Sequence, residues 1–560
     1  MASVAVRAHR PMTEPAPPPQ GAPAPGSQGA SLVSAALLIA AVTVVARIIG
    51  LLRFIVLAQV FGTECLGKVY ATANAVPNIV YELVVGGALV AVVVPLVAGA
   101  MESDPTRVRA TVAALHGWAL VLLVPMTAVM YLASTWVVQI LLGSANGCGA
   151  EAPTVARDML WVFLLQIPIY GATVVAQGAL QAHHRFFAPA VAPAISSLVV
   201  ITSYLIYAQM AGEESGSLVA LSDAEFLVLA GGTTLGVGAL LAVQIPALAR
   251  AGLIVKPSLS FPTGRSAQAR TLAWSGAVVV GMQWIGYAAA IRWSNVYGSS
   301  AIVFVLGWTV FLLPWSILVL PIATSTFPRL SALHERGDQI GSAQTVAHSL
   351  RAVFVASAIG AAGLAAAAEP LAAIMFESAP GRGGVTELSA FLMAVSVGAL
   401  GYGVHGHLVR AMAARHRAQT AAWTTAAGWG LGILAAWVLV IRAEGAPQVA
   451  RGIGLGFSGG LLVAAGLLLV AIRRDAGPSA LTGVLRVALV SSAAALCVGW
   501  VGHVLLSGGS GGSSMAVAVV QIFVAGVAAV VVVGGAAALA DPTSVRTLLR
   551  VRSRAKGSRS

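Results

Sequence analysis

Long apolar segments alternate with short polar ones along almost the whole chain. A transmembrane helix needs about 20 predominantly apolar residues, and most of these segments reach or exceed that length. The pattern therefore predicts an all-α polytopic membrane protein with fourteen transmembrane helices. We expect these helices at residues 31–60, 66–100, 107–142, 153–182, 187–211, 224–250, 268–297, 300–330, 342–367, 386–413, 416–441, 447–472, 482–506 and 515–540.

Composition and charge support this class. Hydrophobic residues make up 58% of the 560 residues and charged residues only 9%, whereas a soluble protein carries about 25% charged residues. The net charge of +13 would suggest nucleic-acid binding in a soluble protein. Here the basic residues concentrate in the even-numbered loops and in the C-terminal tail, a bias that sets membrane topology. We therefore expect no nucleic-acid partner and both termini in the cytoplasm.

The two ends of the chain differ from its middle. Residues 1–30 are rich in Pro, Ala, Gly and Gln, so we expect a disordered cytoplasmic tail, and they lack the apolar region of a signal peptide. Residues 541–560 form a basic cytoplasmic tail. This tail is either a topology anchor, which we favour, or a contact with anionic lipid head groups.

Two arginines interrupt the first apolar segment, which reads VVARIIGLLRFIVLAQVFG over residues 44–62. A charge at membrane depth costs a few kcal/mol even on forgiving scales. On a helix, Arg47 and Arg53 lie about 120° apart and roughly 9 Å along the axis, with Gly50 midway between them. We expect this cationic face, with its bare backbone notch, to point into a polar cavity.

One carboxylate, Glu82, lies near the centre of the second predicted span, at a depth similar to that of Arg47. We expect Glu82 to pair with Arg47 and to neutralise part of the resting site. A pyrophosphate would then compete for Arg47 and Arg53. The alternative is a purely structural Arg47–Glu82 bridge, with Arg53 extending toward the membrane surface.

The sequence lacks the motifs of several common enzyme classes. It contains no HExxH, DxD or P-loop pattern, and we predict neither catalysis nor a cofactor. His405 and His407 are two residues apart and do not share a helix face, which argues against a metal site. Cys65 and Cys148 both fall in predicted extracytoplasmic loops, where a disulfide is permitted, but we favour chance placement. Among the internal prolines, Pro77 and Pro314 are candidate hinges, with ordinary bending as the alternative.

Four segments carry a resemblance to a known family. They are ARIIGLLRFIVLAQVFG in the first span, NAVPNIVYELVVGGALVAVVVPLVA in the second, LQAHHRFFAPAVAPAISS between the fourth and fifth, and LPIATSTFPRLSALHERGD at the end of the eighth. Together they resemble the bacterial lipid II flippases, MurJ or MviN, of the MOP exporter superfamily. The Ala- and Arg-rich composition suggests a divergent actinobacterial-type member.

This resemblance implies a function and a division into parts. Flippases of the family move the undecaprenyl-pyrophosphate-linked peptidoglycan precursor, lipid II, from the inner to the outer leaflet of the bacterial cell membrane by alternating access. The implied parts are an N lobe at 31–250, a cytoplasmic linker at 251–267, a C lobe at 268–472 and a helix pair at 473–540 that borders a groove for the lipid tail. We expect a monomer that binds lipid II and membrane lipids, with cell-wall synthesis or division proteins as further candidate partners.

The resemblance also points to site residues. Arg47 and Arg53 match the paired arginines of the family's first helix, and Asn78 belongs to its Pro-Asn motif. With Gly50 and Glu82 they form the predicted substrate-binding set. Elsewhere the charges are rearranged. This chain has Lys68 where the best-known pattern has an acid, Tyr81 and Glu82 in place of two arginines, Gly86 in place of an acid and Thr309 in place of an arginine.

Three alternatives to a lipid II flippase remain at this point. A related MOP exporter would carry another polyprenyl-linked glycan or a drug. A membrane enzyme acting on polyprenyl lipids would need clustered carboxylates near a membrane surface, and the sequence offers no such cluster. A scaffold for cell-wall enzymes would not need charges at mid-membrane.

Overall fold

The computed structural model is helical over nearly all of the residues that it describes. These are residues 25–83, 105–143, 147–183, 185–219, 221–260, 266–381, 383–507 and 514–542, and within them no residue belongs to a strand. The expected tails lie mostly outside this part of the chain. The first helix begins at Pro25, so residues 25–30, which we expected to be disordered, are helical.

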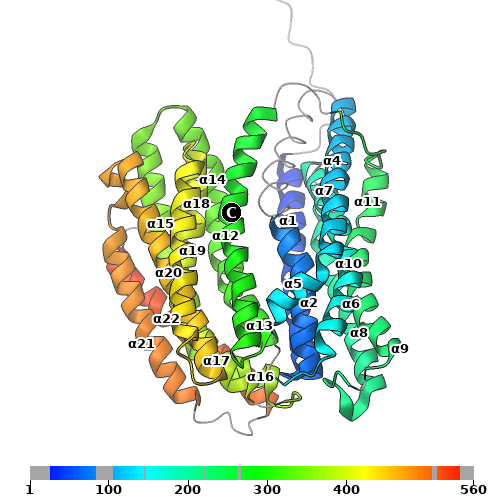
Figure 1. Cartoon of the computed structure of the whole chain (residues 1–560). Coiled ribbons are helices and arrows are strands. Elements are labelled where there is room, and N and C mark those ends of the chain that lie inside the picture. Colours follow the sequence, from blue (N-terminus) through cyan, green and yellow to red (C-terminus); the bar gives the residue numbers. More distant parts are fainter. Residues whose placement is uncertain are drawn as a thin grey trace, which may run out of the picture.

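The helices fall into two halves that lie side by side (Figure 1). The first half contains α1 (Pro25–Phe61), α2 (Cys65–Tyr81), α4 (Pro105–Leu132), α5 (Ser134–Leu142), α6 (Ala152–Leu164), α7 (Gln166–Ala182), α8 (Phe187–Ala211), α9 (Asp223–Phe226), α10 (Gly232–Ala242) and α11 (Ile245–Arg250). The second half contains α12 (Ser266–Val296), α13 (Ala301–Pro314), α14 (Leu320–Glu335), α15 (Gln339–Ala366), α16 (Ala368–Phe376), α17 (Gly384–Ser396), α18 (Gly398–Ala414), α19 (Ala418–Val440) and α20 (Ala446–Ala476), followed by α21 (Val484–Ser507) and α22 (Met515–Ala540).

Most of the predicted spans correspond to long apolar helices. Within the described residues, 11 helical segments are long and apolar enough to cross a membrane, and the pair α17–α18, bent by 51°, would be a twelfth. The predicted span 268–297 corresponds to α12, and the span 66–100 corresponds to α2 up to Tyr81, while residues 84–100 lie outside the described part of the chain. The membrane-protein class is confirmed, and the count of fourteen stays a prediction. The short helix α16 was not predicted.

The bundle has two chemically different ends. A disulfide joins Cys65 to Cys148 at one of them, with Cα atoms 5.4 Å apart. We call this the disulfide end, and it lies at the bottom of Figure 1. The opposite end, where α11 ends at Arg250 and α14 passes into α15 at Arg336, is called the basic end. The expectation that the two cysteines are unpaired is therefore wrong.

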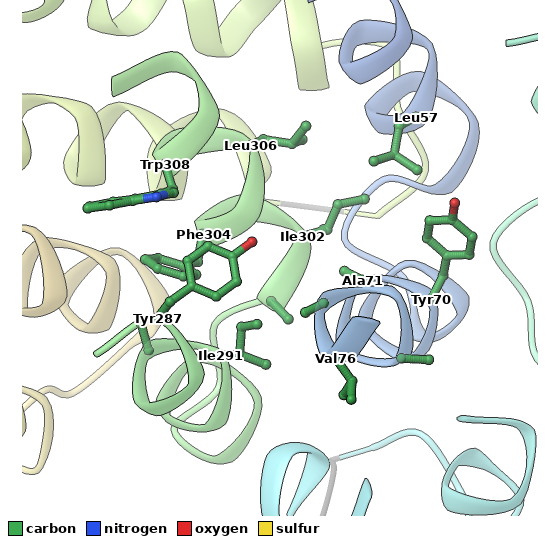
Figure 2. Packing of buried hydrophobic residues seen from close by; sticks show 14 of the residues in the cluster. Leu57, Tyr70, Ala71, Val76, Tyr287, Ile291, Ile302, Phe304, Leu306 and Trp308 are labelled. Carbon is green, nitrogen blue, oxygen red and sulfur yellow. The ribbon is translucent and has the colours of Figure 1, made fainter. Parts of the chain in front are cut away.

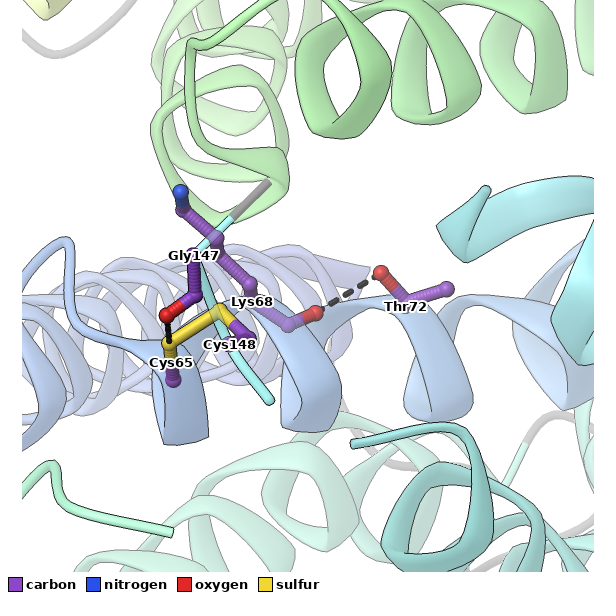
Figure 3. The surroundings of a disulfide bond; sticks show 5 residues. All are labelled: Cys65, Lys68, Thr72, Gly147 and Cys148. Carbon is purple, nitrogen blue, oxygen red and sulfur yellow. Dashed lines mark hydrogen bonds between the residues drawn. A yellow bond between two sulfur atoms is a disulfide. The ribbon is translucent and has the colours of Figure 1, made fainter. Parts of the chain in front are cut away.

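The disulfide connects two segments that are distant in sequence. It links the first residue of α2 to the loop between α5 and α6 (Figure 3). One turn further along α2, the Thr72 hydroxyl donates to the Lys68 carbonyl at 2.7 Å. Sequence reasoning placed both cysteines at the same end but had no access to the separation of their Cα atoms, which decides whether a bond can form.

At the disulfide end, polar bonds join the two halves. The Gln59 amide donates to the Ile374 carbonyl at 2.8 Å. The Asn295 amide donates to the Thr72 hydroxyl at 2.9 Å and to the Leu141 carbonyl at 3.1 Å. These bonds tie α1 to α16, and α12 to α2 and α5.

The backbones also approach closely at this end. The Thr63 amide donates to the Pro380 carbonyl at 3.1 Å. The neighbouring Gly62 has a φ of +55°, and a Cβ there would lie 1.7 Å from the Pro380 oxygen. Only glycine adopts this conformation and leaves room for the other half.

An apolar core continues from this contact into both halves (Figure 2). Ile302 of α13 points toward Leu57 of α1 and Ala71 of α2, while Phe304 and Tyr287 pack on the other side of α13. These residues belong to one cluster of buried side chains. The disulfide end is therefore held by apolar packing as well as by hydrogen bonds.

Within the second half, small residues bring α19 and α20 close together. A Cβ on Gly432 would lie 3.0 Å from the Gly460 Cα, and a Cβ on Gly456 would lie 2.4 Å from the Ala436 Cα. Close approach through small residues is the usual way in which membrane helices pack, because lipid supplies no hydrophobic force between them.

At the basic end of the second half, Arg415 is almost completely buried and fully bonded. Its guanidinium donates to Asp475 at 2.6 Å, to the Ser342 hydroxyl at 2.6 Å and to the Gln339 amide oxygen at 3.1 Å. Arg417 binds the second Asp475 oxygen at 2.9 Å. This network joins the α18–α19 turn to the start of α15 and the end of α20.

The last two helices pack on the outside of the second half. Both α21 and α22 contact α15 and each other. An ion pair between Arg351 of α15 and Asp541, just after α22, holds the final helix in place. These contacts put the predicted tail-groove pair beside the second half, while its role as a groove stays a prediction.

Candidate functional site

The predicted cationic face of α1 is open in the structure. Arg47 is exposed and Arg53 is half-buried. The Arg53 guanidinium lies 4.7 Å from the ring centre of Phe54. A Cβ added to Gly50 would meet no atom within 4 Å. No described neighbour fills the notch between the arginines, as a ligand-facing surface requires.

Side chains of α2 and α7 meet at Tyr170. The Tyr170 hydroxyl donates to the Asn78 amide oxygen at 3.2 Å, and the ring of Tyr170 packs on that of Tyr81 with centres 4.3 Å apart. Asn78, from the predicted set, therefore contacts a tyrosine of the neighbouring helix.

The predicted Arg47–Glu82 pair does not form. Over the described part of the chain, no ion pair within 4 Å joins Glu82 to Arg47 or Arg53. The axial rise of a helix predicts the depth of a side chain but not which neighbouring helix it faces. Glu82 lies directly after α2, where its backbone amide donates to the Asn78 and Ile79 carbonyls.

The second half contributes a cation that sequence reasoning did not select. Arg410 of α18 is half-buried, and its guanidinium lies 5.6 Å from the ring centre of Trp315. It donates to the Gly406 carbonyl of its own helix at 2.8 Å. Arg410 was assigned to loop topology because it lies near the end of a predicted span. Its position within that span was the available signal.

Tyr402 lies beside the same tryptophan. Its ring meets that of Trp315 edge to face, with centres 5.3 Å apart. Arg410, Trp315 and Tyr402 thus form one group of side chains in the second half.

The candidate hinge prolines lie close to this site. Pro77 is buried inside α2, one turn before Glu82. Pro314 ends α13 and is followed by a π-helical turn at Trp315–Val319, which leads into α14. A proline removes a backbone hydrogen bond, and such π-turns are frequent at functional sites. The structure supports an irregular helix at Pro314, and its role as a hinge stays a prediction.

The histidines of α18 face different neighbours, as their spacing predicted. His405 bonds the Thr425 hydroxyl and His407 bonds the Ser349 hydroxyl, each at 2.9 Å. Among the described residues, no three His, Cys, Asp or Glu side chains are placed to hold a metal ion.

Comparison with known proteins decides the family. The family model described as "Lipid II flippase MurJ" matches residues 57–534. This chain belongs to the lipid II flippase MurJ family. A probable lipid II flippase MurJ from Vibrio cholerae is 25% identical over 397 residues, which cover 66% of this chain and 70% of that protein. A probable lipid II flippase MurJ from Rhizobium tropici is 29% identical over 180 residues, and this match spans only 34% of its length.

Solved structures support the same fold. A lipid II flippase MurJ in an inward closed conformation has a TM-score of 0.66 and 16% identity, with 91% of this chain and 100% of that chain covered. A multidrug resistance MATE transporter of the MOP superfamily, in an inward-facing conformation, has a TM-score of 0.58 and 14% identity, with coverage of 78% and 95%. The fold is thus shared by flippases and drug exporters.

The family match separates the alternatives that fold alone leaves open. The MurJ family consists of lipid II flippases, which are transporters of the membrane and not enzymes. The drug exporter resembles this chain in fold only, so the exporter alternative is not favoured. The resemblance to the MurJ family is confirmed, although the match begins at residue 57 and so leaves out most of the first segment, with Arg47 and Arg53.

Proposed function

We propose that this chain moves lipid II across the bacterial cell membrane by alternating access, and that it binds the pyrophosphate between its two halves. The observation that carries this proposal is the placement of Arg53 and Arg410 on opposite halves, each beside an aromatic ring. Within the described residues neither guanidinium has a carboxylate partner within 4 Å. A phosphate accepts the paired donors of a guanidinium better than water or a lone carboxylate does.

The rearranged charges of this chain support the role of Arg410. The family resemblance places an arginine where this chain has Thr309, and the Thr309 hydroxyl donates to the Val305 carbonyl of its own helix at 2.9 Å. Position 309 lies on α13, whereas Arg410 lies on α18. The second half therefore still contains a guanidinium, although it comes from a different helix. Arg47, Gly50, Asn78 and Glu82 complete the proposed site on the first half.

Glu82 has a distinct role in this proposal. It adds one negative charge to the proposed site, and within the described residues it forms no ion pair within 4 Å. In the absence of substrate it offsets part of the positive potential. A pyrophosphate, with more acceptor oxygens, then competes for the guanidinium groups.

The proposed lobes follow the two halves, with an N lobe at 31–250, a linker at 251–267, a C lobe at 268–472 and a tail groove at 473–540. We also propose that the disulfide end faces outward. Basic residues favour cytoplasmic loops, and a disulfide persists in an oxidising exterior. Alternating access then requires the contacts at Gly62–Pro380 and Thr72–Asn295 to separate.

Depletion in living cells tests the activity. A strain depleted of its own flippase and supplied with this chain should grow, and its lipid II should be found in the outer leaflet. Growth without lipid II in the outer leaflet, or retention of lipid II in the inner leaflet, contradicts the proposal. The Arg157→Ala variant is a matched control, because Arg157 forms a surface ion pair with Asp158 and lies outside the proposed site.

Reporter fusions test the orientation. Reporters placed after residue 260 and after Ser560 should read cytoplasmic, and one in the 212–222 loop should read outside. An inward reading from the 212–222 loop would reverse the proposed direction of the bundle.

A further inference from the structure

The first residue after the bend at Pro314 connects this bend to the cation of the second half. Trp315 opens the π-helical turn that separates α13 from α14. The Arg410 guanidinium of α18 lies 5.6 Å from the centre of its ring. A cation is attracted to an aromatic face within about 6 Å. Two adjacent positions, 314 and 315, thus combine a break in a helix with a contact to a charge.

The ring of Trp315 lies against α18, where a glycine makes room for it. A Cβ added to Gly406 would lie 2.4 Å from the Cη2 atom of Trp315, so the ring occupies the space of a side chain at position 406. The carbonyl of the same glycine accepts from Arg410 at 2.8 Å. Gly406 therefore admits the ring and also binds the guanidinium that the ring holds.

Pro314 contacts a different helix from Trp315. A Cβ added to Gly360 of α15 would lie 2.5 Å from the Cβ atom of Pro314. The proline thus packs on α15, while the tryptophan packs on α18. A proline also removes one backbone hydrogen bond from its helix, so the helix bends more easily there. A displacement of α18 relative to α15 therefore acts on the backbone between these two residues.

The packing around this bend is incomplete. A cavity of about 10 Å³ is lined by Pro314, Trp315 and Tyr402, among others. Ser357 of α15 lines the same cavity, and its buried hydroxyl has no hydrogen-bond partner among the described residues. Side chains beside a void lose contacts on one side. A small rearrangement of the bend therefore disturbs fewer contacts here than in a close-packed core.

We propose that Trp315 is a positioning residue for the pyrophosphate and that it links pyrophosphate binding to the bend at Pro314. This inference rests on the proposed function. A guanidinium has five N–H donors, and the Gly406 carbonyl accepts from Arg410. The remaining donors of Arg410, held in place by the Trp315 ring, bind phosphate oxygens. The bound pyrophosphate draws the guanidinium toward itself, the ring follows, and the backbone at Pro314 changes its bend.

The rate of flipping at varied lipid II content tests the positioning role. The full chain is reconstituted in liposomes, and the lipid II content that gives half of the maximal rate is measured. We expect Trp315→Leu to raise this content roughly tenfold, the scale of a desolvated cation–π contact. Trp315→Phe keeps an aromatic face and should restore most of the affinity, which a role in packing alone does not predict.

A glycine variant moves the ring without removing it. Gly406→Ala places a Cβ in the space of the Trp315 ring and keeps both Trp315 and Arg410, so it should raise the same lipid II content. Alanine favours a helix more than glycine does, and α18 should form as before. Gly459→Ala in α20 is the matched control, because a Cβ there would meet no atom of the described residues within 4 Å. Size-exclusion chromatography and circular dichroism check the folding of each variant.

Spin labels on either side of the bend test its link to binding. Tyr297 precedes α13 and Ser325 lies on α14, and both are exposed. The labels are attached in a Tyr297→Cys/Ser325→Cys variant, after the exposed free cysteine is removed by Cys497→Ser. We expect saturating undecaprenyl pyrophosphate to change the distance between the labels. The added substitution Trp315→Leu should abolish this change.

The outcomes separate this inference from the proposed function. Equal half-maximal lipid II contents for the wild-type and Trp315→Leu proteins overturn the inference alone, and so does a label distance that binding leaves unchanged. Failure of the wild-type chain to move lipid II contradicts the proposed function instead. The label distance depends on binding and not on flipping, so it tests the link to the bend in that case as well.

Discussion

The arginines at the basic end differ from those of the proposed site in their partners. Arg415 is 3% exposed and uses its guanidinium on Asp475, Ser342 and Gln339. Arg53, by contrast, has the Phe54 ring as its close contact, and Arg410 has the Trp315 ring and one carbonyl of its own helix. All three are cations in a chain that is only 9% charged.

This difference distinguishes charges that stabilise the fold from charges that cost folding free energy and serve the function. A buried charge is tolerated when its partners satisfy it, and such a group holds elements together. A charge at membrane depth without a carboxylate partner costs free energy that folding does not recover, and such residues usually mark a substrate pathway. Pairing, more than depth alone, therefore distinguishes Arg415 from Arg53.

The largest expected effect is on folding, in the Arg415→Ala variant. Removing this guanidinium leaves the buried Ser342 hydroxyl without its partner and takes one of two arginines away from Asp475. We expect a loss of about 3 kcal/mol in stability, the scale for breaking a buried pair. Thermal unfolding in detergent measures it, with Arg417→Ala as a milder control because Arg417 is 61% exposed. An unchanged midpoint would remove the contrast between the two groups of arginines.

The next effect is on transport, in the Arg53→Ala variant. We expect roughly a hundredfold loss of flipping, since a ligand phosphate loses a charged partner, while the thermal midpoint stays near that of the wild-type protein. Lipid II in the outer leaflet and growth of the depleted strain are the measurements. Full growth with Arg53→Ala would show that Arg53 is no ligand and would place it with the structural residues.

The third prediction concerns the Cys65–Cys148 disulfide, a covalent bond that we expect to contribute to stability and not to transport. In the Cys65→Ser/Cys148→Ser double variant we expect a loss of about 2 kcal/mol in stability, within the range typical of such bonds. Flipping per folded molecule should be close to normal, because the bond lies within one half and does not cross the contact between halves. A thermal melt and a flipping assay normalised to folded protein separate the two effects. Loss of flipping at normal stability would give the bond a role in transport.

The smallest effect concerns the shape of the cation at position 410. Lysine keeps the charge of Arg410 but lacks the planar fork that binds two phosphate oxygens. We expect Arg410→Lys to lower flipping about tenfold, the effect of roughly one charge-assisted hydrogen bond, and Arg410→Ala to lower it further. Equal activity of the Lys and wild-type proteins would indicate that positive potential alone is needed in the second half.

Much of the architecture could be predicted from the sequence because lipid imposes a simple requirement. A membrane helix satisfies its own backbone hydrogen bonds, so the length of each apolar segment predicts a span without reference to other parts of the chain. The same regularity gave the depths of Arg47, Arg53 and Glu82. It also predicted that His405 and His407 face different neighbours.

Which side chains interact with one another depends on the tertiary structure. The rise of a helix does not specify its rotation against distant helices, and Glu82 forms no ion pair with Arg47 among the described residues. The position of Arg410 beside Trp315 became visible only once α18 was packed against the turn that follows α13. Cys65 and Cys148, separated by 83 positions in the chain, pair because folding brings their Cα atoms to 5.4 Å. The sequence by itself determined which segments enter the membrane and how deep their charges lie, whereas packing between helices decided which of those charges are paired.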